Sequence, residues 1–209
     1  MYAKKISPDI YVVEDFVSES ERLEVFAIIN SLSESSWYSV QTKETDFFWG
    51  KQFTREVRAN KDDILIRLTD RVMNLVQGRF FDNNQVDGEI VKGFIDIGIH
   101  RYFKGDYIGA HRDNHEYSPD TVRFGICIYY NDDYEGGELF YPELDITYKP
   151  KAGDLVIHGG NILHQSLPVT SDSIRYISTC FAKGTSEYPI TLNQEVFGSV
   201  EEEDGSLYY

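Results

Sequence analysis

Residues 122–130 read VRFGICIYY, and this stretch decides the fold class of the chain. It is a nearly continuous apolar and aromatic run in which only Arg123 is charged. A run of this length and composition is typical of a β-strand that is buried on both faces. We therefore expect residues 122–130 to lie inside a β-rich structure.

Further strand-like segments lie on both sides of this run. Residues 91–103 alternate between two faces. One face carries Ile97 and Ile99, and the other carries His100 and Tyr102. Shorter strands are expected at residues 138–141, 146–148, 154–158 and 174–181. Regular short strands separated by Gly, Asp and Pro turns favour a sandwich or barrel of jelly-roll type.

Two helices are expected before these strands, packed on the outside of the β structure. Ser18 and Glu21 have the spacing of a capping box at the start of the first helix. The second helix is predicted over residues 60–76, with Asn60 as its N-cap. Its predicted buried stripe consists of Ile64, Leu68, Val72 and Leu75. The predicted fold is therefore mainly β (α+β), with a jelly-roll core and supporting N-terminal helices.

Length and composition favour one acidic domain. The chain has 209 residues and a net charge of −15, which argues against a nucleic-acid partner because nucleic-acid affinity depends on clustered Lys and Arg. Cys127 and Cys180 lie in apolar runs and are expected as buried free thiols in a reducing compartment. With no apolar signal region and no apolar run near membrane length, we expect a cytoplasmic protein without a membrane partner. Residues 201–204 are expected to form a solvated acidic tail.

His111 and Asp113 are the first candidate metal ligands. Alternate side chains of an extended segment point to the same side, so this pair can share one small cation. His164 is the best third ligand, because it follows a glycine-containing turn and starts an expected strand. Two histidines and one carboxylate suit non-haem Fe(II), with the opposite face left open for a cosubstrate and dioxygen.

Arg175 is a candidate anion-binding residue. On its expected strand it shares a face with Ile177 and Thr179. An inward arginine on an otherwise apolar strand is costly unless it meets an anion, and its planar guanidinium can bind a carboxylate by two hydrogen bonds. A dioxygen-activating iron commonly takes electrons from an oxo acid, and the far carboxylate of an oxo diacid needs such a cation. The alternative is a strand-end arginine that curls into solvent.

The remaining histidines and one aromatic segment have less defined roles. His100 shares the face of Tyr102, and two interpretations stay open for it, a place in the lining of the barrel interior and a structural role, of which the structural role is favoured. His158 is expected in the core, and His115 is expected at the surface. Residues 37–53 carry Trp37 and a cluster of further aromatic residues among polar ones. Two interpretations of this segment stay open, namely a strand or loop packed on the core and an aromatic lid beside a pocket.

An ordered series of motifs resembles the Fe(II)- and 2-oxoglutarate-dependent dioxygenases, specifically their prolyl 4-hydroxylase-like branch. The resemblance covers about residues 94–183. The motifs that carry it are Tyr102-x-x-Gly105, His111-Arg112-Asp113-Asn114, Cys127-Ile128-Tyr129-Tyr130-Asn131, Gly136-Gly137-Glu138-Leu139, Lys149-Pro150-Lys151-Ala152-Gly153-Asp154, His164 with Pro168-Val169, and Arg175-Tyr176. Collagen-type enzymes usually have Lys at the position of Arg175, so Arg175-Tyr176 is more similar to the oxygen-sensing type and its bacterial relatives. Phe181 stands where the nucleic-acid demethylase branch usually carries a second arginine.

The resemblance implies a double-stranded β-helix core and a set of site residues. His111, Asp113 and His164 would hold Fe(II). The residues implied at the 2-oxoglutarate site are Arg175 and Tyr130 at the C5 carboxylate, Tyr102 lining the pocket, and Thr179 beside the cosubstrate. Arg123 matches a position that can touch substrate, although a solvated strand-end charge is an equal alternative.

The implied reaction is hydroxylation of an unactivated C–H bond with release of succinate and CO2, most readily on a prolyl residue of a peptide or protein. Fe(II), 2-oxoglutarate and O2 would be required, with ascorbate as a possible reductant. A small-molecule or other side-chain hydroxylase and a non-catalytic metal-binding or ligand-binding jelly-roll module remain alternatives. The single domain 1–209 would comprise helical support and lid (1–88), catalytic core (89–185) and a C-terminal extension with the acidic tail (186–209).

Overall fold

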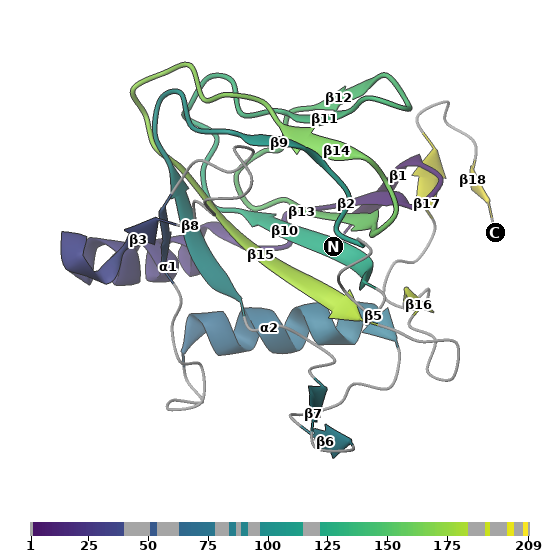
Figure 1. Ribbon diagram of the computed structural model, residues 1–209, viewed down its shortest axis with the longest axis horizontal. Helices are drawn as coiled ribbons and strands as arrows, with labels where there is room; N and C mark the ends of the chain where they lie inside the picture. The colour runs from purple at the N-terminus through teal and green to yellow at the C-terminus, as the bar shows by residue number, and fades with distance from the viewer. Residues whose placement is uncertain are drawn as a thin grey trace.

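Two β-sheets lie face to face in this protein, with helices on the outer side of the larger sheet (Figure 1). The structure is a computed structural model, and it describes residues 2–39, 51–53, 63–77, 84–86, 89–91, 97–114, 122–183, 191–192, 200–202 and 207–208. The larger sheet has the order β18 (Leu207–Tyr208), β17 (Val200–Glu202), β1 (Tyr2–Ser7), β2 (Ile10–Glu14), β13 (Leu155–Gly159), β10 (Val122–Tyr129), β15 (Arg175–Lys183), β8 (Gly98–Tyr102), β4 (Lys51–Phe53) and β3 (Tyr38–Ser39).

The smaller sheet covers one face of the larger sheet. Its order is β12 (Ile146–Tyr148), β11 (Leu139–Tyr141), β14 (His164–Ser166) and β9 (Ile108–His111). Two short pairs, β5 (Val76–Gln77) with β16 (Thr191–Leu192) and β6 (Asn84–Val86) with β7 (Glu89–Val91), lie apart from both sheets. The two facing sheets confirm the predicted double-stranded β-helix and leave an interior space between them.

The central strand β10 is buried on both faces, as its sequence predicts. It pairs antiparallel with β13 on one side and with β15 on the other. Phe124, Ile126 and Ile128 point into the core beneath the helices. Tyr129 belongs to the second core cluster, between the two sheets, and Cys127 packs against that cluster. Alternate side chains therefore meet two different apolar layers, which explains the continuous apolar run.

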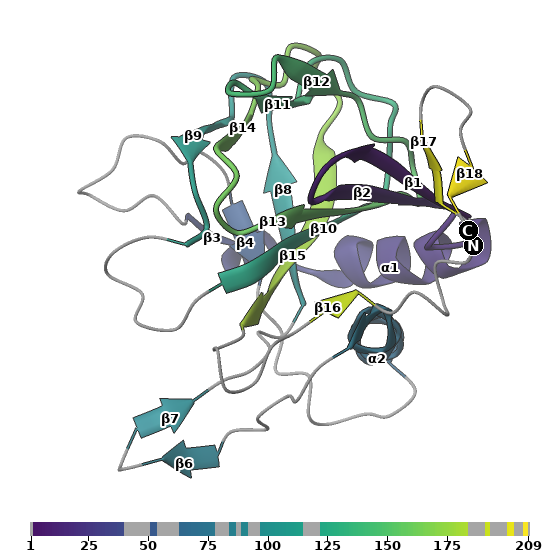
Figure 2. The same cartoon turned by 90° about the vertical axis from the view of Figure 1, so that its right-hand side faces the viewer.

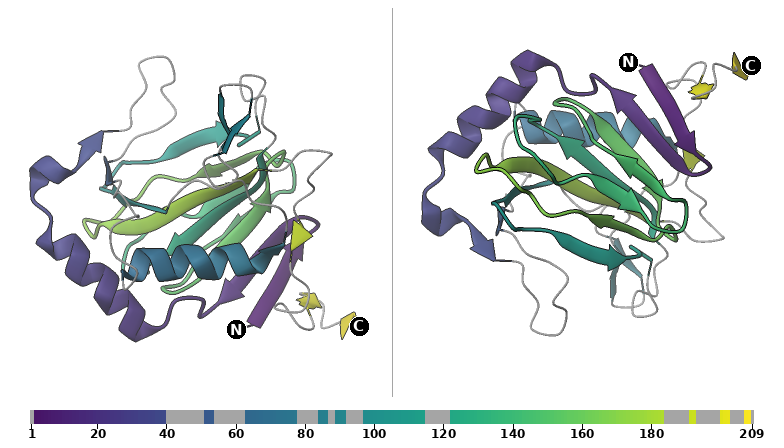
Figure 3. Two further views of the ribbon diagram at one scale, coloured as in Figure 1. Left: turned by 90° about the horizontal axis from the view of Figure 1, so that it is seen from below. Right: turned by 90° about the horizontal axis from the view of Figure 1, so that it is seen from above.

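The helices α1 (Glu19–Ser31) and α2 (Ile64–Leu75) pack on the outer face of the larger sheet (Figures 2 and 3). The capping box predicted for α1 is present, with Ser18 and Glu21 each satisfying the other's backbone N–H. For α2 the predicted N-cap is wrong. Its N-cap is Asp63, whose carboxylate accepts from the N–H of Leu65 at 3.0 Å, while Asn60 lies outside the described residues. The predicted stripe of α2 is buried.

Two further sequence expectations fall partly outside the described residues. Of the strand expected at 91–103, Val91 belongs to β7, which pairs with β6, and residues 98–102 form β8, which pairs with β15 and β4, while residues 92–96 lie outside the described residues. Part of the expected acidic tail is a strand, since β17 pairs in parallel with β1 and places Glu201 opposite Lys4 in the register. The backbone groups at the outer edge of β1 provide hydrogen-bonding partners that sequence patterning does not reveal.

The described ends of the aromatic segment 37–53 lie at one edge of the larger sheet, where β3 and β4 extend it beyond β8. Trp37 is buried, and the guanidinium of Arg101 lies 4.2 Å from its ring centroid. Residues 40–50, on which the lid interpretation depends, lie outside the described residues, so that interpretation stays a prediction. None of the helices in the described part of the chain has the length and apolar character that a membrane crossing requires.

Candidate active site

A cavity of about 270 Å³ opens between the two sheets. Its wall contains most of the predicted site residues, namely Tyr102, His111, Asp113, His164, Arg175 and Thr179. Its other lining residues are His100, Ile108, Gly125, Ile126, Cys127, Tyr129, Leu139, His158, Ser166, Ile177 and Phe181. The fold thus brings together six of the eight residues that the sequence analysis assigned to the site.

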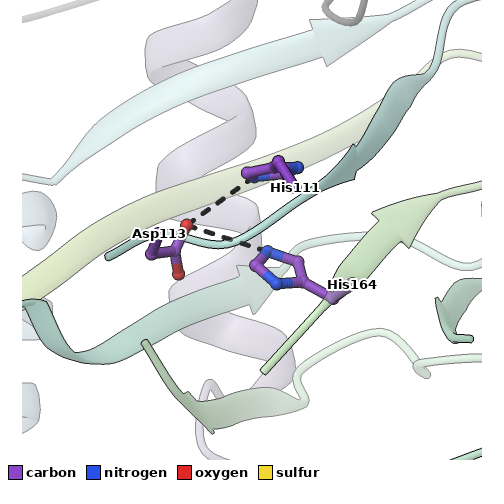
Figure 4. A group of neighbouring side chains, drawn as sticks. All are labelled: His111, Asp113 and His164. Atoms are coloured by element: carbon purple, nitrogen blue, oxygen red, sulfur yellow. Dashed lines mark ion pairs between the residues drawn. The ribbon is translucent and has the colours of Figure 1, made fainter. Parts of the chain in front are cut away.

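His111, Asp113 and His164, which all line this cavity, point toward one another (Figure 4). One oxygen of Asp113, Oδ1, lies 3.6 Å from Nε2 of His111 and 3.7 Å from Nε2 of His164. The three potential ligand atoms all lie within 4.8 Å of one another. Strands β9 and β14 create this geometry, because their antiparallel pairing sets His164 opposite His111.

Each histidine of this triad is oriented by a backbone carbonyl. Nδ1 of His111 lies 2.8 Å from the carbonyl oxygen of Gly109, and Nδ1 of His164 lies 2.9 Å from that of Ile162. A carbonyl oxygen accepts, so the hydrogen of each ring resides on Nδ1 and the lone pair of Nε2 faces the shared centre. This arrangement is the one that metal-binding histidines need, and the donor set of two imidazoles and a carboxylate fits Fe(II).

The electrostatics of the triad favour an anionic Asp113. Burial opposes its charge, but the interactions of Asp113 with His111 and His158 outweigh burial and hold the pKa of Asp113 well below its usual range. Burial lowers the pKa of His164 to about 3. Burial also acts to lower the pKa of His111, but its interactions with Asp113 and the carbonyl of Gly109 dominate and raise it. The negative charge of Asp113 can therefore balance part of the charge of a bound cation.

Arg175 lies in the cavity wall on β15 and is almost completely buried, with 1% exposure. Its Nη1 donates to the carbonyl of Gly137 at 2.7 Å and to the hydroxyl of Ser166. No described residue accepts a hydrogen bond from its Nε or Nη2. The guanidinium carbon lies 4.1 Å from the ring centroid of Tyr102. A buried guanidinium with two N–H-bearing nitrogens unused inside a cavity fits a carboxylate ligand, as predicted.

Thr179 and His100 form a polar pair on the cavity wall. The hydroxyl of Thr179 lies 2.8 Å from Nε2 of His100. Burial, followed by the positive charge of Arg175, lowers the pKa of His100 to about 3. Both residues line the cavity, so His100 reaches the interior of the barrel, and the place of Thr179 beside a cosubstrate stays a prediction.

Tyr130 does not line the cavity, which corrects its predicted position at the cosubstrate carboxylate. Its hydroxyl lies 2.7 Å from the hydroxyl of Ser178, and its side chain packs in the core beneath the helices. Tyr129 lines the cavity instead. Side chains along β10 alternate, so Tyr129 shares its face with Gly125 and Cys127, and the next residue points the other way.

Arg123 is exposed and is not part of the cavity lining. Its guanidinium carbon lies 5.0 Å from the ring centroid of Phe124. The residue sits at the start of β10, where the register with β15 shifts between residues 122 and 124. A role for Arg123 in substrate binding therefore stays a prediction.

His158 is the residue whose position the sequence analysis missed. It was expected in the core, and it is indeed buried, but its Nε2 lies 3.1 Å from Oδ2 of Asp113. The available signal was a histidine directly after the apolar run Leu155–Ile157. Alternation along the strand predicts the face of the sheet on which this side chain lies, but it does not predict the contact with Asp113. His115 lies outside the described residues.

The family model described as the 2OG-Fe(II) oxygenase superfamily matches residues 97–183. Solved structures share the fold at low sequence identity. A viral collagen prolyl hydroxylase from Paramecium Bursaria Chlorella virus-1, solved as a 2OG complex, is 19% identical with a TM-score of 0.59, covering 85% of this chain and 97% of that chain. A Pseudomonas putida prolyl-4-hydroxylase is 16% identical with a TM-score of 0.59, covering 84% of this chain and 92% of that chain.

A third structure, from Trichoplax adhaerens, is a prolyl hydroxylase in complex with a hypoxia inducible factor oxygen degradation domain peptide fragment. It is 16% identical with a TM-score of 0.61, covering 84% of this chain and 83% of that chain. No curated protein sequence matches the chain. The family match spans the strands that carry the triad and Arg175, and the solved structures share the surrounding fold. Residues 97–183 of this chain are therefore similar to the 2OG-Fe(II) oxygenase superfamily, and the chain shares its fold with these prolyl hydroxylases.

Proposed function

We propose that this chain is an Fe(II)- and 2-oxoglutarate-dependent dioxygenase that hydroxylates a prolyl residue of a peptide or protein. The observation that carries the proposal is the placement of a His-Asp-His triad and a buried arginine with unused N–H groups in one cavity. The triad suits Fe(II), and the arginine suits the distal carboxylate of an oxo diacid.

The triad would hold Fe(II) through Nε2 of His111, Nε2 of His164 and Oδ1 of Asp113. When bound, iron would supply dioxygen activation coupled to oxidative decarboxylation of 2-oxoglutarate to succinate and CO2. The protein's contribution is to orient these ligands through the carbonyls of Gly109 and Ile162.

Arg175 would bind the C5 carboxylate of 2-oxoglutarate through its Nε and Nη2. Its position is fixed by the carbonyl of Gly137 and by the hydroxyl of Ser166, which occupy Nη1. Apolar side chains of Ile108, Leu139 and Ile177 line the same cavity and would exclude water from the reacting groups. In a site of low dielectric the guanidinium–carboxylate attraction is stronger than in water.

A peptide or protein substrate is the choice that the structural neighbours support. One of them is described as bound to a peptide fragment, and two are described as prolyl hydroxylases of collagen or prolyl-4-hydroxylase type. The strongly acidic net charge of −15 agrees with a partner that is not a nucleic acid. Ascorbate would serve as the reductant that keeps the iron in the ferrous state.

Succinate formation from 2-oxoglutarate is the first test of this function. Purified protein supplied with Fe(II), ascorbate and 2-oxoglutarate should produce succinate even without substrate, whereas the His111→Ala variant should not. A panel of proline-containing peptides, with matched peptides carrying alanine for proline, should then gain one oxygen by mass spectrometry only when proline is present. Equal succinate formation by wild type and His111→Ala would contradict the enzyme assignment. Oxygen gain by the alanine peptides would contradict the prolyl assignment alone.

A further inference from the structure

We propose that His158 is a positioning residue for the metal centre, which holds Asp113 so that only one carboxylate oxygen faces the metal. This inference rests on the proposed function, because it concerns the same triad. His158 lies on β13 and is buried, with 1% exposure, and it contributes to the cavity wall.

The two oxygens of Asp113 face different partners. Oδ1 lies 3.6 Å and 3.7 Å from the Nε2 atoms of His111 and His164, so it points to the shared centre of the triad. Oδ2 lies 3.1 Å from Nε2 of His158. A carboxylate oxygen can only accept, so Nε2 of His158 carries the hydrogen and donates it. The hydrogen bond therefore divides the carboxylate into one ligand oxygen and one anchored oxygen.

The other ring nitrogen of His158 agrees with this assignment. Nδ1 lies 3.5 Å from the hydroxyl of Tyr141, at the outer limit of a hydrogen bond, and the two rings meet edge to face with centroids 6.0 Å apart. A hydroxyl can donate to an unprotonated Nδ1, which leaves the ring hydrogen on Nε2. Tyr141 itself is completely buried on β11. Tyr141 on the smaller sheet therefore contacts His158, and His158 in turn contacts Asp113.

Gly125 supplies independent support, because the contact fits only above a residue without a side chain. It pairs with His158 in the register of β10 and β13. A Cβ atom at position 125 would lie 2.0 Å from Oδ2 of Asp113 and 2.5 Å from Nε2 of His158. Both distances are far below any allowed contact, so the glycine leaves room for the hydrogen bond.

The consequence for the metal centre is a monodentate carboxylate. A carboxylate that rotates freely can bind through both oxygens and take a coordination position that the reaction needs for cosubstrate or dioxygen. Anchoring Oδ2 prevents this rotation and fixes Oδ1 in place before metal arrives. Groups that orient a metal ligand in this way contribute strongly to affinity, typically on the order of 10- to 100-fold.

The test compares three substitutions at position 158 by anaerobic calorimetric titration with Co(II) and by the visible spectrum of the Co(II)-loaded protein. His158→Phe keeps a ring but has no donor, and His158→Leu removes ring and donor. His158→Gln keeps an N–H donor. We expect the Phe and Leu variants to bind Co(II) about 10- to 100-fold more weakly, with an altered spectrum, and the Gln variant to recover most of the affinity. Tyr141→Phe should weaken binding less, and Gly125→Ala should weaken it as His158→Phe does.

Recovery by Gln separates positioning from packing, because a purely structural role would follow ring volume instead of hydrogen-bond donation. Equal Co(II) affinity and spectrum in wild type and His158→Phe would overturn the proposal. If His158→Phe does not fold, the Co(II) affinities and spectra of His158→Gln and Tyr141→Phe are compared with those of wild type instead. Wild type and His111→Ala serve as controls for the metal site itself. Failure of wild-type protein to bind Co(II), or equal binding by His111→Ala, would overturn the proposed function. Equal binding by wild type and His158→Phe would overturn only the role of His158.

Discussion

His111 and His164 stand opposite each other on neighbouring strands, with their Cα atoms paired in the register of β9 and β14 and their ring centroids 4.4 Å apart. The two residues are far apart in sequence, and this single antiparallel pairing brings them together. The pairing also explains why the last strand of the smaller sheet is essential to the site, since β9 is the strand that leads directly to Asp113.

Replacing His164 with alanine should abolish metal-dependent turnover. The variant loses one of three ligands, and the remaining pair cannot hold Fe(II) in a fixed geometry. Succinate formation should fall to the level of a metal-free control, while the fold, followed by circular dichroism, should persist. Tyr130→Phe provides a control, because it changes a buried side chain that does not line the cavity. Full turnover by His164→Ala would exclude this histidine from the triad.

Replacing Arg175 with alanine should raise the KM for 2-oxoglutarate much more than the requirement for iron. A hydrogen bond to a charged group contributes roughly 1.5 to 3 kcal/mol, and about 1.4 kcal/mol corresponds to a tenfold change in affinity, so a rise of at least tenfold is expected. Arg175→Lys should recover part of the loss, because it keeps the charge but not the planar geometry. The measurement is succinate formation over a range of 2-oxoglutarate concentrations. An unchanged KM would remove Arg175 from the cosubstrate site.

Tyr130→Phe should leave the KM for 2-oxoglutarate unchanged and reduce stability slightly. Its hydroxyl bonds Ser178 inside the core, so the loss should be on the order of 1 kcal/mol in the free energy of unfolding. Urea denaturation of Tyr130→Phe, Ser178→Ala and the double variant forms a double-mutant cycle that isolates this contact. An increased KM in Tyr130→Phe would return the residue to the cosubstrate site and contradict its observed position.

The metal-free protein should lose stability as the pH falls from about 6.5 to about 3, and His100 should contribute to this loss. Burial lowers the pKa of His100 from 6.5 in a model peptide to about 3 in the fold. Over this window the unfolded chain binds the proton and the folded chain does not, so acid favours unfolding, and the stabilisation is complete only above pH 6.5. Each such group contributes a slope of roughly 1 kcal/mol per pH unit.

His100→Gln tests this assignment, because glutamine does not titrate and its amide can still form a hydrogen bond with the hydroxyl of Thr179. In urea denaturation at several pH values, the slope of the unfolding free energy against pH should be smaller in the variant, because about one proton fewer is taken up on unfolding. Identical slopes in the two proteins would show that His100 does not have the lowered pKa.

Several parts of the fold could be predicted because they depend on local patterns. The capping box at Ser18 and the buried stripe of α2 follow from helical spacing, and both are present. The strands β11, β12, β13 and β15, which follow β10 in the chain, were recognisable from short strand-like runs between turns. The N-cap of α2 was misplaced, because Asn60 and Asp63 are both good caps and only the folded chain selects the start.

The features of the candidate site also fall into those that local sequence patterns predict and those that depend on the tertiary structure. The sequence by itself determined the ligand types and the spacing that lets His111 and Asp113 point to the same side of an extended segment, and it indicated an inward arginine on the strand that became β15, because side chains alternate along extended segments. Only the tertiary structure decided that Tyr129 and not Tyr130 lines the cavity, and that His158 bonds Asp113 above Gly125. These facts depend on which layer each face of β10 meets and on the register of β10 with β13, and both are fixed by contacts between segments distant in sequence.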